Sequence, residues 1–361
     1  MARVAFLLPD FCVGGAERVA LTLIEAFVKR GIEVDLVLLR KQGELLKLLP
    51  SSVKVFSLNA RRIRQAIRPL AAYLRERRPD ALQASMWPVT LVAIAARWIA
   101  GCKCRLVISD HAILSRQYAG LGGLHDMFLR GSIAALYPRA DARVAVSEGA
   151  ARDLSSLGCL DRESIDVIHN PVSLGTRLGA EPDWGGEGVR VLAVGSLKPV
   201  KNYPLLLEAF AQFAATRPAR LLILGEGELR LELEQLATTL GIADRVMMPG
   251  EIGDPSPYYA SAQLLVLSSD HEGYGNVLVE ALHHGLTMVS TDCPSGPSEI
   301  LDGGRFGYLV PCGDARALAE AIAMAADAPM PPQQLIGRAR SLSGPDIIDR
   351  YLHLLLPGMA S

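Results

Sequence analysis

Glu272 and Glu280 are the residues of this sequence whose type and spacing most clearly suggest chemistry. They stand on either side of a glycine-rich segment, and a short apolar run at residues 263–267 precedes them. Such a run is typical of a buried parallel strand, and the apolar spacing after it predicts a helix with Asn276 as N-cap and Gly285 as its stop. An ionised glutamate only accepts hydrogen bonds, and a sugar ring offers neighbouring hydroxyl donors. The two carboxylates therefore indicate a ligand with two sugar rings.

The residues between the glutamates favour a phosphate site built from the backbone. Gly273 and Gly275 let the chain approach a ligand closely, and the free N–H groups of the first helical turn attract an anion. Tyr274, Asn276 and Val277 complete this turn, and we expect the segment to contact one ligand. Sugar hydroxyls on the glutamates and phosphates on the turn suit a nucleotide-sugar diphosphate. On spacing alone, an ordinary surface helix with solvated glutamates remains the alternative.

Further segments extend this pattern along the chain. In sequence order they are Gly14-Gly15 after the first apolar run, Asn170-Pro171, the stretch 194–201, Gly225-Glu226-Gly227 and Pro249-Gly250. Together with the two glutamates, these segments resemble glycosyltransferase family 4, whose members are retaining enzymes of the GT-B fold. The resemblance covers essentially the whole chain.

The resemblance implies an α/β fold in which two Rossmann-like, doubly wound domains face each other across a cleft. It also implies catalytic roles for Glu272 on the hydroxyls of the donor sugar, for His111 on the transferred sugar and for Lys201 on the diphosphate. Glu280 would hold the ribose diol. The other donor-binding positions that we expect are Gly14, Gly15, Ser196, Lys198, Gly250, Gly273, Tyr274, Gly275, Asn276 and Val277. The histidines His283 and His284, in the last turn of the helix, are predicted to be structural cations that interact with its dipole.

One position departs from the family pattern. The family commonly has an arginine directly after the glycine that ends the first strand of the second domain, and this chain has Ser196 there. Lys198 is the residue that would supply the missing charge. If it does not, the grip on the diphosphate depends on Lys201 and backbone amides.

The segment that follows the glutamates indicates which class of sugar donor the protein uses. Residues 294–297 read Pro-Ser-Gly-Pro before Glu299, which is similar to bacterial transferases that add hexose or N-acetylhexosamine to lipid-linked oligosaccharides. This similarity favours a UDP-sugar donor and a lipid-linked (undecaprenyl-type) or polysaccharide acceptor in cell-envelope glycan synthesis. The alternatives are a GT-B nucleotide-sugar epimerase, a GDP-mannose-dependent transferase and a catalytically silent GT-B binding subunit.

Neither metals nor cofactors are expected. The sequence contains no D-x-D motif and no P-loop, and its Gly225-Glu226-Gly227 segment lacks the third glycine of a dinucleotide fingerprint. The leaving diphosphate must then be neutralised by protein cations and helix ends. The six cysteines, among them Cys102 and Cys104, lack zinc-site spacing and are predicted to be reduced and mostly buried, as in a cytoplasmic protein.

Strand-like and helical patterns alternate along the chain and predict two domains with parallel sheets. We expect an acceptor-side domain at residues 1–172, a linker at 173–188, a nucleotide-sugar-binding domain at 189–345 and a C-terminal helix at 346–361 that crosses back to the first domain. The longest uncharged apolar segment, residues 86–96, is far shorter than the roughly 20 residues that span a bilayer.

Charge divides unevenly between the two halves. Residues 1–170 hold 24 Lys and Arg against 16 Asp and Glu, so this half is positive, and residues 61–78 alone hold seven arginines and one acid. This arginine-rich stretch could bind the anionic inner surface of the cytoplasmic membrane. The alternative is an ordinary helix that packs on the sheet and has a basic outer face. Nucleic-acid motifs are absent, and the apolar residues within 111–137 suggest a groove for a lipid acceptor.

Overall fold

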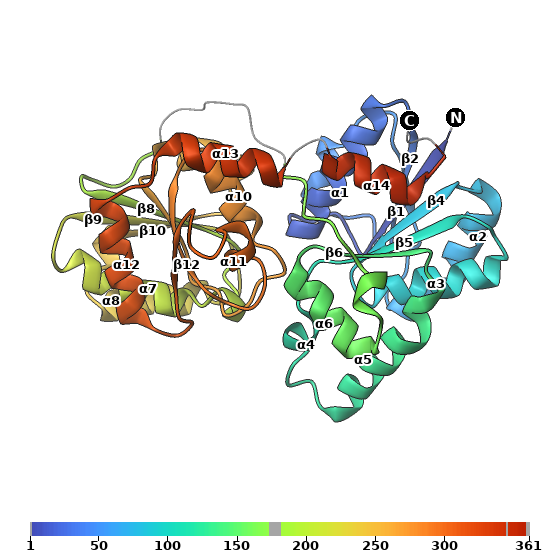
Figure 1. The fold of residues 1–361 in the computed structure, drawn as a ribbon, viewed down its shortest axis with the longest axis horizontal. Coiled ribbons are helices and arrows are strands. Elements are labelled where there is room, and N and C mark those ends of the chain that lie inside the picture. Colours follow the sequence, from blue (N-terminus) through green and yellow to red (C-terminus); the bar gives the residue numbers. More distant parts are fainter. Residues whose placement is uncertain (1, 173–181, 344–345, 359–361) are drawn as a thin grey trace. The chain divides into compact units, whose positions relative to one another are not determined.

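The computed structural model describes residues 2–172, 182–343 and 346–358 (Figure 1). The chain forms two compact units, one of Met1–Pro171 with Gly344–Ser361 and one of Val172–Ser343. Of the predicted linker, residues 173–181 lie outside the described part of the chain.

The first unit is built on a seven-stranded parallel sheet of order β3-β2-β1-β4-β5-β6-β7. The chain reverses its direction across the sheet between β1 and β4, and open α/β sheets bind ligands at the carboxyl ends of the strands beside such a point. The strands are β1 (Arg3–Leu8), β2 (Glu33–Leu38), β3 (Lys54–Ser57), β4 (Ala81–Ser85), β5 (Arg105–Asp110), β6 (Ala142–Ala145) and β7 (Asp166–Val167).

Helices cover both faces of this sheet because its strands are apolar on both sides. They are α1 (Gly15–Lys29), α2 (Ile67–Arg77), α3 (Val89–Ala100), α4 (Leu114–Gln117), α5 (Gly123–Leu136), α6 (Glu148–Gly158) and α14 (Asp346–Leu355), with 3-10 turns at Glu44–Leu48, Ile63–Ala66, Tyr137–Arg139 and Arg162–Ser164. The last helix, α14, packs on β4 and β5 and buries Ile347, Tyr351 and Leu355 in the core that also holds Phe6 and Phe27. Figure 1 shows it as a red helix lying across β1 and β4.

The second unit has a six-stranded parallel sheet of order β10-β9-β8-β11-β12-β13. Its direction reverses between β8 and β11, so the loops after these two strands meet at the carboxyl edge. The strands are β8 (Val189–Val194), β9 (Ala219–Leu224), β10 (Val246–Gly250), β11 (Leu264–Leu267), β12 (Thr287–Thr291) and β13 (Tyr308–Val310).

The helices of the second unit are α7 (Tyr203–Ala214), α8 (Arg230–Thr239), α9 (Ser256–Ser261), α10 (Asn276–His283), α11 (Pro297–Ile300), α12 (Ala315–Asp327) and α13 (Pro332–Leu342), with 3-10 turns at Pro199–Lys201 and Ala243–Arg245. Phe210 and Phe213 of α7 pack with Leu221 of β9 and Ile322 of α12 in one apolar core. The predicted α/β class with parallel sheets is confirmed.

The cysteines differ from the prediction. All six are free thiols, but only Cys104 and Cys293 are buried, and Cys12, Cys159 and Cys312 are exposed. The prediction that they are mostly buried is therefore wrong, because three of them follow the ends of secondary structure and lie in surface turns. Among the described helices, none combines the length and the apolar character that crossing a membrane requires.

Candidate active site

The loop from β11 to α10 carries the first glutamate at the carboxyl edge of the second sheet. The Lys201 Nζ, from the turn after β8, donates to Glu272 Oε1 at 2.6 Å, and the Ser269 hydroxyl donates to the same oxygen at 2.6 Å. The exposed fractions of the Lys201 and Glu272 side chains are 20% and 11%. An ion pair so far removed from water is held in one geometry, and it joins the two strands at which the sheet reverses direction.

Neighbouring loops hold this segment from both sides. On one side, the Ser268 hydroxyl donates to the carbonyl of Lys201 at 2.8 Å, and the Asp270 amide donates to the carbonyl of Val200 at 2.9 Å. On the other side, the Thr291 hydroxyl donates to the carbonyl of Ser269 at 2.6 Å. The position of Glu272 is therefore fixed by backbone contacts from three strand ends.

The helix α10 begins where the sequence predicts, but with a different cap. Gly275, not Asn276, is the N-cap residue, and its φ of 100° lies in the left-handed region that favours glycine. No side chain caps this end, and the Leu278 amide donates to the carbonyl of Gly275 at 2.9 Å. The positive end of the helix dipole favours an anion here. At the other end Gly285 has a φ of 65°, as expected for a glycine that stops a helix.

The second glutamate, Glu280, lies about one turn after the start of α10 at Asn276. The Tyr259 hydroxyl, from α9, donates to Glu280 Oε2 at 2.6 Å, and the Tyr259 ring stacks on His284 with 5.5 Å between centroids. Burial lowers the pKa of both His283 and His284 below the usual 6.5. Burial therefore disfavours the charged form that the dipole would stabilise, whereas the structural contacts expected for both histidines are present. His284 packs against the Tyr259 ring, and His283 Nε2 lies 2.6 Å from the Ser343 hydroxyl.

The turn after β8 carries the position where the family has an arginine. Ser196 is half-buried there and Lys198 is exposed. A close approach of backbones fixes this turn, because a Cβ on Gly225 would lie 2.0 Å from the carbonyl oxygen of Gly195. Gly250, at the end of β10, accepts a hydrogen bond from the Gly225 amide at 2.9 Å. The predicted donor-binding residues of the second unit therefore surround one sheet edge.

His111 directly follows β5 in the first unit. Its Nε2 lies 3.1 Å from the Ser109 hydroxyl, which accepts from the Gln83 amide at 2.9 Å and lies 3.0 Å from the Ser85 hydroxyl. Burial lowers the pKa of His111 to about 4, and a hydrogen bond with Asn170 opposes that effect. The imidazole is therefore neutral at physiological pH and is aligned by neutral polar side chains.

The adjacent carboxyl group, Asp110, is buried with two donors. The Tyr137 hydroxyl lies 2.8 Å from it and the Trp87 amide 3.1 Å from it. Burial nevertheless raises the pKa of Asp110 to about 6. This carboxyl group ties the loop after β4 to the 3-10 turn Tyr137–Arg139.

The predicted glycine turn of the first unit opens α1. Gly14 is its N-cap in extended conformation and Gly15 is its first, exposed residue. A Cβ on Gly14 would lie 2.3 Å from a carboxylate oxygen of Glu17, so this side chain folds back over the start of the helix. A carboxylate there interacts well with the helix dipole.

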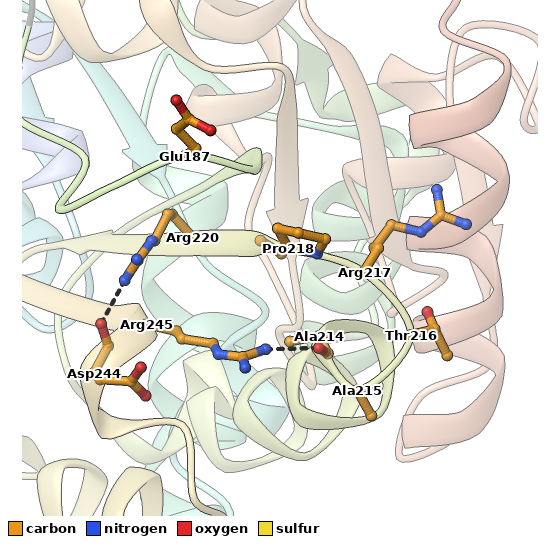
Figure 2. Close-up of a pocket in the computed structure, with 10 residues that line it drawn as sticks. Glu187, Ala214, Ala215, Thr216, Arg217, Pro218, Arg220, Asp244 and Arg245 are labelled. Atoms are coloured by element: carbon orange, nitrogen blue, oxygen red, sulfur yellow. Dashed lines mark hydrogen bonds between the residues drawn. The ribbon is translucent and has the colours of Figure 1, made fainter.

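Figure 2 shows a cavity of about 420 Å3 at the opposite, amino edge of the second sheet. Its arginines are engaged by the fold: Arg220 donates to the carbonyl of Asp244 at 2.6 Å and Arg245 to the carbonyl of Ala214 at 2.7 Å. Arg217 pairs with Asp327 at 2.6 Å. This cavity is separate from the predicted site because the sheet lies between them.

Two family models match the chain. The model described as Glycosyltransferase Family 4 matches residues 13–175, and the model described as Glycosyl transferases group 1 matches residues 188–327. The chain belongs to glycosyltransferase family 4. Both units of this glycosyltransferase are covered by the two matches.

Curated relatives include glycosyltransferases of lipid-linked glycans and of lipopolysaccharide. An N-acetylgalactosaminyltransferase of Campylobacter jejuni, named for a diphospho-undecaprenol glycan, is 33% identical over 61% of this glycosyltransferase and 59% of its own length. The lipopolysaccharide core glycosyltransferase LpsE of Rhizobium meliloti is 29% identical over 86% of this chain and 84% of its own. Among solved structures, HepE of Anabaena with UDP and glucose superposes with a TM-score of 0.82 at 21% identity, covering 99% of this chain and 100% of its own, which shows the GT-B fold.

Two residues in contact with the predicted site escaped the sequence prediction. Ser269 lies beside Glu272 in the sequence, and its place directly after a buried strand was a usable signal. Tyr259 contacts Glu280 from another helix, and no spacing rule joins the two. Among the described residues, no group of three or more His, Cys, Asp or Glu is gathered as for a metal ion.

Proposed function

We propose that this glycosyltransferase moves a hexose or N-acetylhexosamine, with retention of configuration, from a UDP-sugar to a lipid-linked or polysaccharide acceptor. The observation that carries the proposal is the Lys201–Glu272 ion pair beside the uncapped start of α10. It brings a cation, a carboxylate and backbone N–H groups together at one sheet edge. These are the groups that a diphosphate and a sugar ring need.

Each residue has a separate part in this proposal. Lys201 and the N–H groups of α10 neutralise the diphosphate, and Glu272 accepts hydrogen bonds from the donor sugar. Glu280 binds the ribose diol, and His111 contacts the transferred sugar as a neutral donor. Because cations and helix ends stabilise the leaving group, no metal or cofactor is required, and chelators are expected to leave the activity unchanged.

The reaction step follows from these positions. The bond between the anomeric carbon and the diphosphate oxygen breaks, and the acceptor oxygen bonds to the same face of that carbon. The leaving phosphate takes the proton of the acceptor hydroxyl. Charge therefore develops on the diphosphate, where Lys201 stabilises it, and Glu272 need not form a covalent bond.

The acceptor is proposed from the relatives and from the surface of the first unit. Two Campylobacter jejuni relatives are named for undecaprenol-linked glycans. On α5 and the loop before it, four large apolar side chains are 57–81% exposed, namely Leu121, Leu124, Met127 and Phe128. This set is called the apolar tip below. An exposed apolar cluster of this kind suits a lipid.

Basic residues lie in the same helical layer. The helix α2 packs on α3, and α3 packs on α5. Arg68 in the first turn of α2 is exposed, as are Arg61 and Arg64 in the segment before it. Arg77, at the end of α2, instead turns inward to the buried Asp35 at 3.0 Å. We propose that this layer rests on the anionic inner face of the cytoplasmic membrane, with the arginines on headgroups and the apolar tip in the acyl boundary.

The Glu272→Ala variant tests the assignment. Transfer, followed by mass spectrometry with a panel of UDP-sugars and GDP-mannose, is expected to fall by about 1000-fold or more because the donor sugar loses its acceptor of hydrogen bonds. Calorimetry is expected to show that UDP still binds. Full activity in this variant would contradict the proposal.

The controls separate the alternatives. Glu208→Ala removes an exposed glutamate on α7 of the same unit and is expected to keep full activity. An altered free sugar formed without acceptor would indicate an epimerase. If the protein neither hydrolyses any donor nor transfers a sugar from it, it is a binding subunit.

A further inference from the structure

Tyr259 is buried against the carboxylate that we assign to the ribose. The side chain is 2% exposed and comes from the short helix α9, and its hydroxyl donates to Glu280 Oε2 at 2.6 Å. The contact joins residues 21 positions apart on different helices. It is a charge-assisted hydrogen bond that little solvent can reach, so it holds the carboxylate oxygen in one place.

The ring of Tyr259 is fixed as well as its hydroxyl. It stacks on His284 with an interplanar angle of 13°, and His284 lies one turn after Glu280 on α10. Burial lowers the pKa of His284, which disfavours a charged imidazole beside the carboxylate. The hydroxyl therefore has a defined direction, toward Glu280.

We propose that Tyr259 is the positioning residue that sets the Glu280 carboxylate for the two ribose hydroxyls of the nucleotide. A glutamate side chain loses up to about 2 kcal/mol of rotamer freedom when it is fixed. Because Tyr259 already fixes the Glu280 side chain in the free protein, this loss of rotamer freedom does not weaken nucleotide binding. The inference rests on the proposed function, which places the ribose at Glu280.

This role predicts a selective loss in Tyr259→Phe. UDP should bind about tenfold more weakly, and the KM for the UDP-sugar should rise by a similar factor, because one charge-assisted hydrogen bond is removed. The value of kcat should change less than about threefold, since the ribose contact is the same in ground and transition states. The preference for UDP over 2′-deoxy-UDP should fall, which a merely structural role would not cause.

The neighbouring tyrosine provides the matched control. Tyr258 lies on the same helix and is half-buried, and Tyr258→Phe is expected to bind UDP and 2′-deoxy-UDP as the unchanged protein does. Thermal unfolding of both variants shows whether either loses the fold. A folded Tyr259→Phe with unchanged discrimination between the two nucleotides overturns the inference.

A third variant separates this inference from the proposed function. Glu280→Gln should abolish most of the preference for UDP over 2′-deoxy-UDP. If it does and Tyr259→Phe does not, only the role of Tyr259 fails. If Glu280→Gln leaves the preference intact, the ribose is not at Glu280, and both the assignment and the inference fail.

Discussion

The carboxyl edge of the second sheet places opposite charges 2.6 Å apart, whereas that of the first sheet places a neutral imidazole at the end of a buried chain of neutral polar groups. In the second unit, Lys201 and Glu272 come from the two strands at which the sheet reverses direction. In the first, His111 follows β5, and Ser109 and Gln83 align it.

On the proposed function, the difference indicates how the two units divide one reaction. A diphosphate requires cations and N–H dipoles, and these are gathered in the second unit. The transferred sugar requires hydrogen bonds that orient it. These should come from neutral groups, because a positive charge there would also attract the leaving phosphate. The first unit provides such groups. We therefore expect changes in the second unit to affect nucleotide binding and leaving-group stabilisation, and changes in the first to affect turnover and the acceptor.

Beyond Glu272→Ala, the largest effect is expected for Lys201→Ala. Removing the cation beside the diphosphate should lower kcat/KM by about 1000-fold, because charge on the leaving group is no longer stabilised. Lys198→Ala, a matched loss of charge at an exposed position, should cost about tenfold or less. Steady-state kinetics checks both variants. Equal losses would mean that Lys198, not Lys201 alone, compensates for Ser196.

In the first unit, His111→Ala should lower kcat about 100-fold while the affinity for UDP stays unchanged. The imidazole is proposed to contact the sugar and not the nucleotide, so binding and turnover should separate. His353→Ala, an exposed histidine of α14 in the same unit, is the control. A weakened UDP affinity in His111→Ala would contradict the division between the two edges.

The neutral state of His111 also predicts a pH-dependent stability. The usual pKa of a histidine is 6.5, and at a pH above this value the His111 imidazole is neutral in both the folded and the unfolded chain. Below 6.5 only the unfolded chain takes up this proton until the pH reaches the folded pKa of about 4, so stability falls over this range. The loss approaches about 3 kcal/mol near pH 4.

His111→Gln should not show this part of the loss. Asp110, with its raised pKa, acts in the opposite direction over part of the range and is common to both proteins, so the difference between them isolates the histidine. Urea unfolding from pH 4 to 7 gives this difference. Parallel stability curves would show that His111 is not held neutral.

A smaller effect is expected at the apolar tip. The double variant Leu124→Ser, Met127→Ser should bind vesicles of phosphatidylglycerol about tenfold more weakly, because apolar area is lost from the acyl boundary. Leu231→Ser removes a leucine that is 71% exposed in the second unit and should bind as the unchanged protein does. Cosedimentation measures both. Equal weakening by the two variants would remove the tip from the proposed membrane face.

The smallest effect is expected for Ser196→Arg. Placing the family arginine beside the diphosphate should tighten UDP binding about threefold, since the site already holds Lys201 and the helix end. Calorimetry measures the change. Weaker binding would show that the turn after β8 has no room for a guanidinium.

Much of this architecture could be predicted because strand and helix patterns alternate regularly and functional residues follow strand ends. Lys201 and Glu272 each stand a few residues after an apolar run, so their position at the sheet edge followed from local sequence. The pairing of Tyr259 with Glu280 and the alignment of His111 by Gln83 could not be predicted, since both depend on packing between elements. The cap of α10 was misplaced by one residue because Asn is a common N-cap and the left-handed φ of Gly275 is not visible in a pattern.

The last helix, α14, has a consequence for synthesis on the ribosome. Tyr351 and Leu355 complete the core of the first unit, but they are translated only after the whole second unit. Domains generally fold in the order in which they emerge from the ribosome. Until α14 has been translated, part of the apolar core of the first unit therefore stays exposed. A chaperone that shields this surface during translation would therefore improve the yield of the whole protein more than that of the second unit expressed alone.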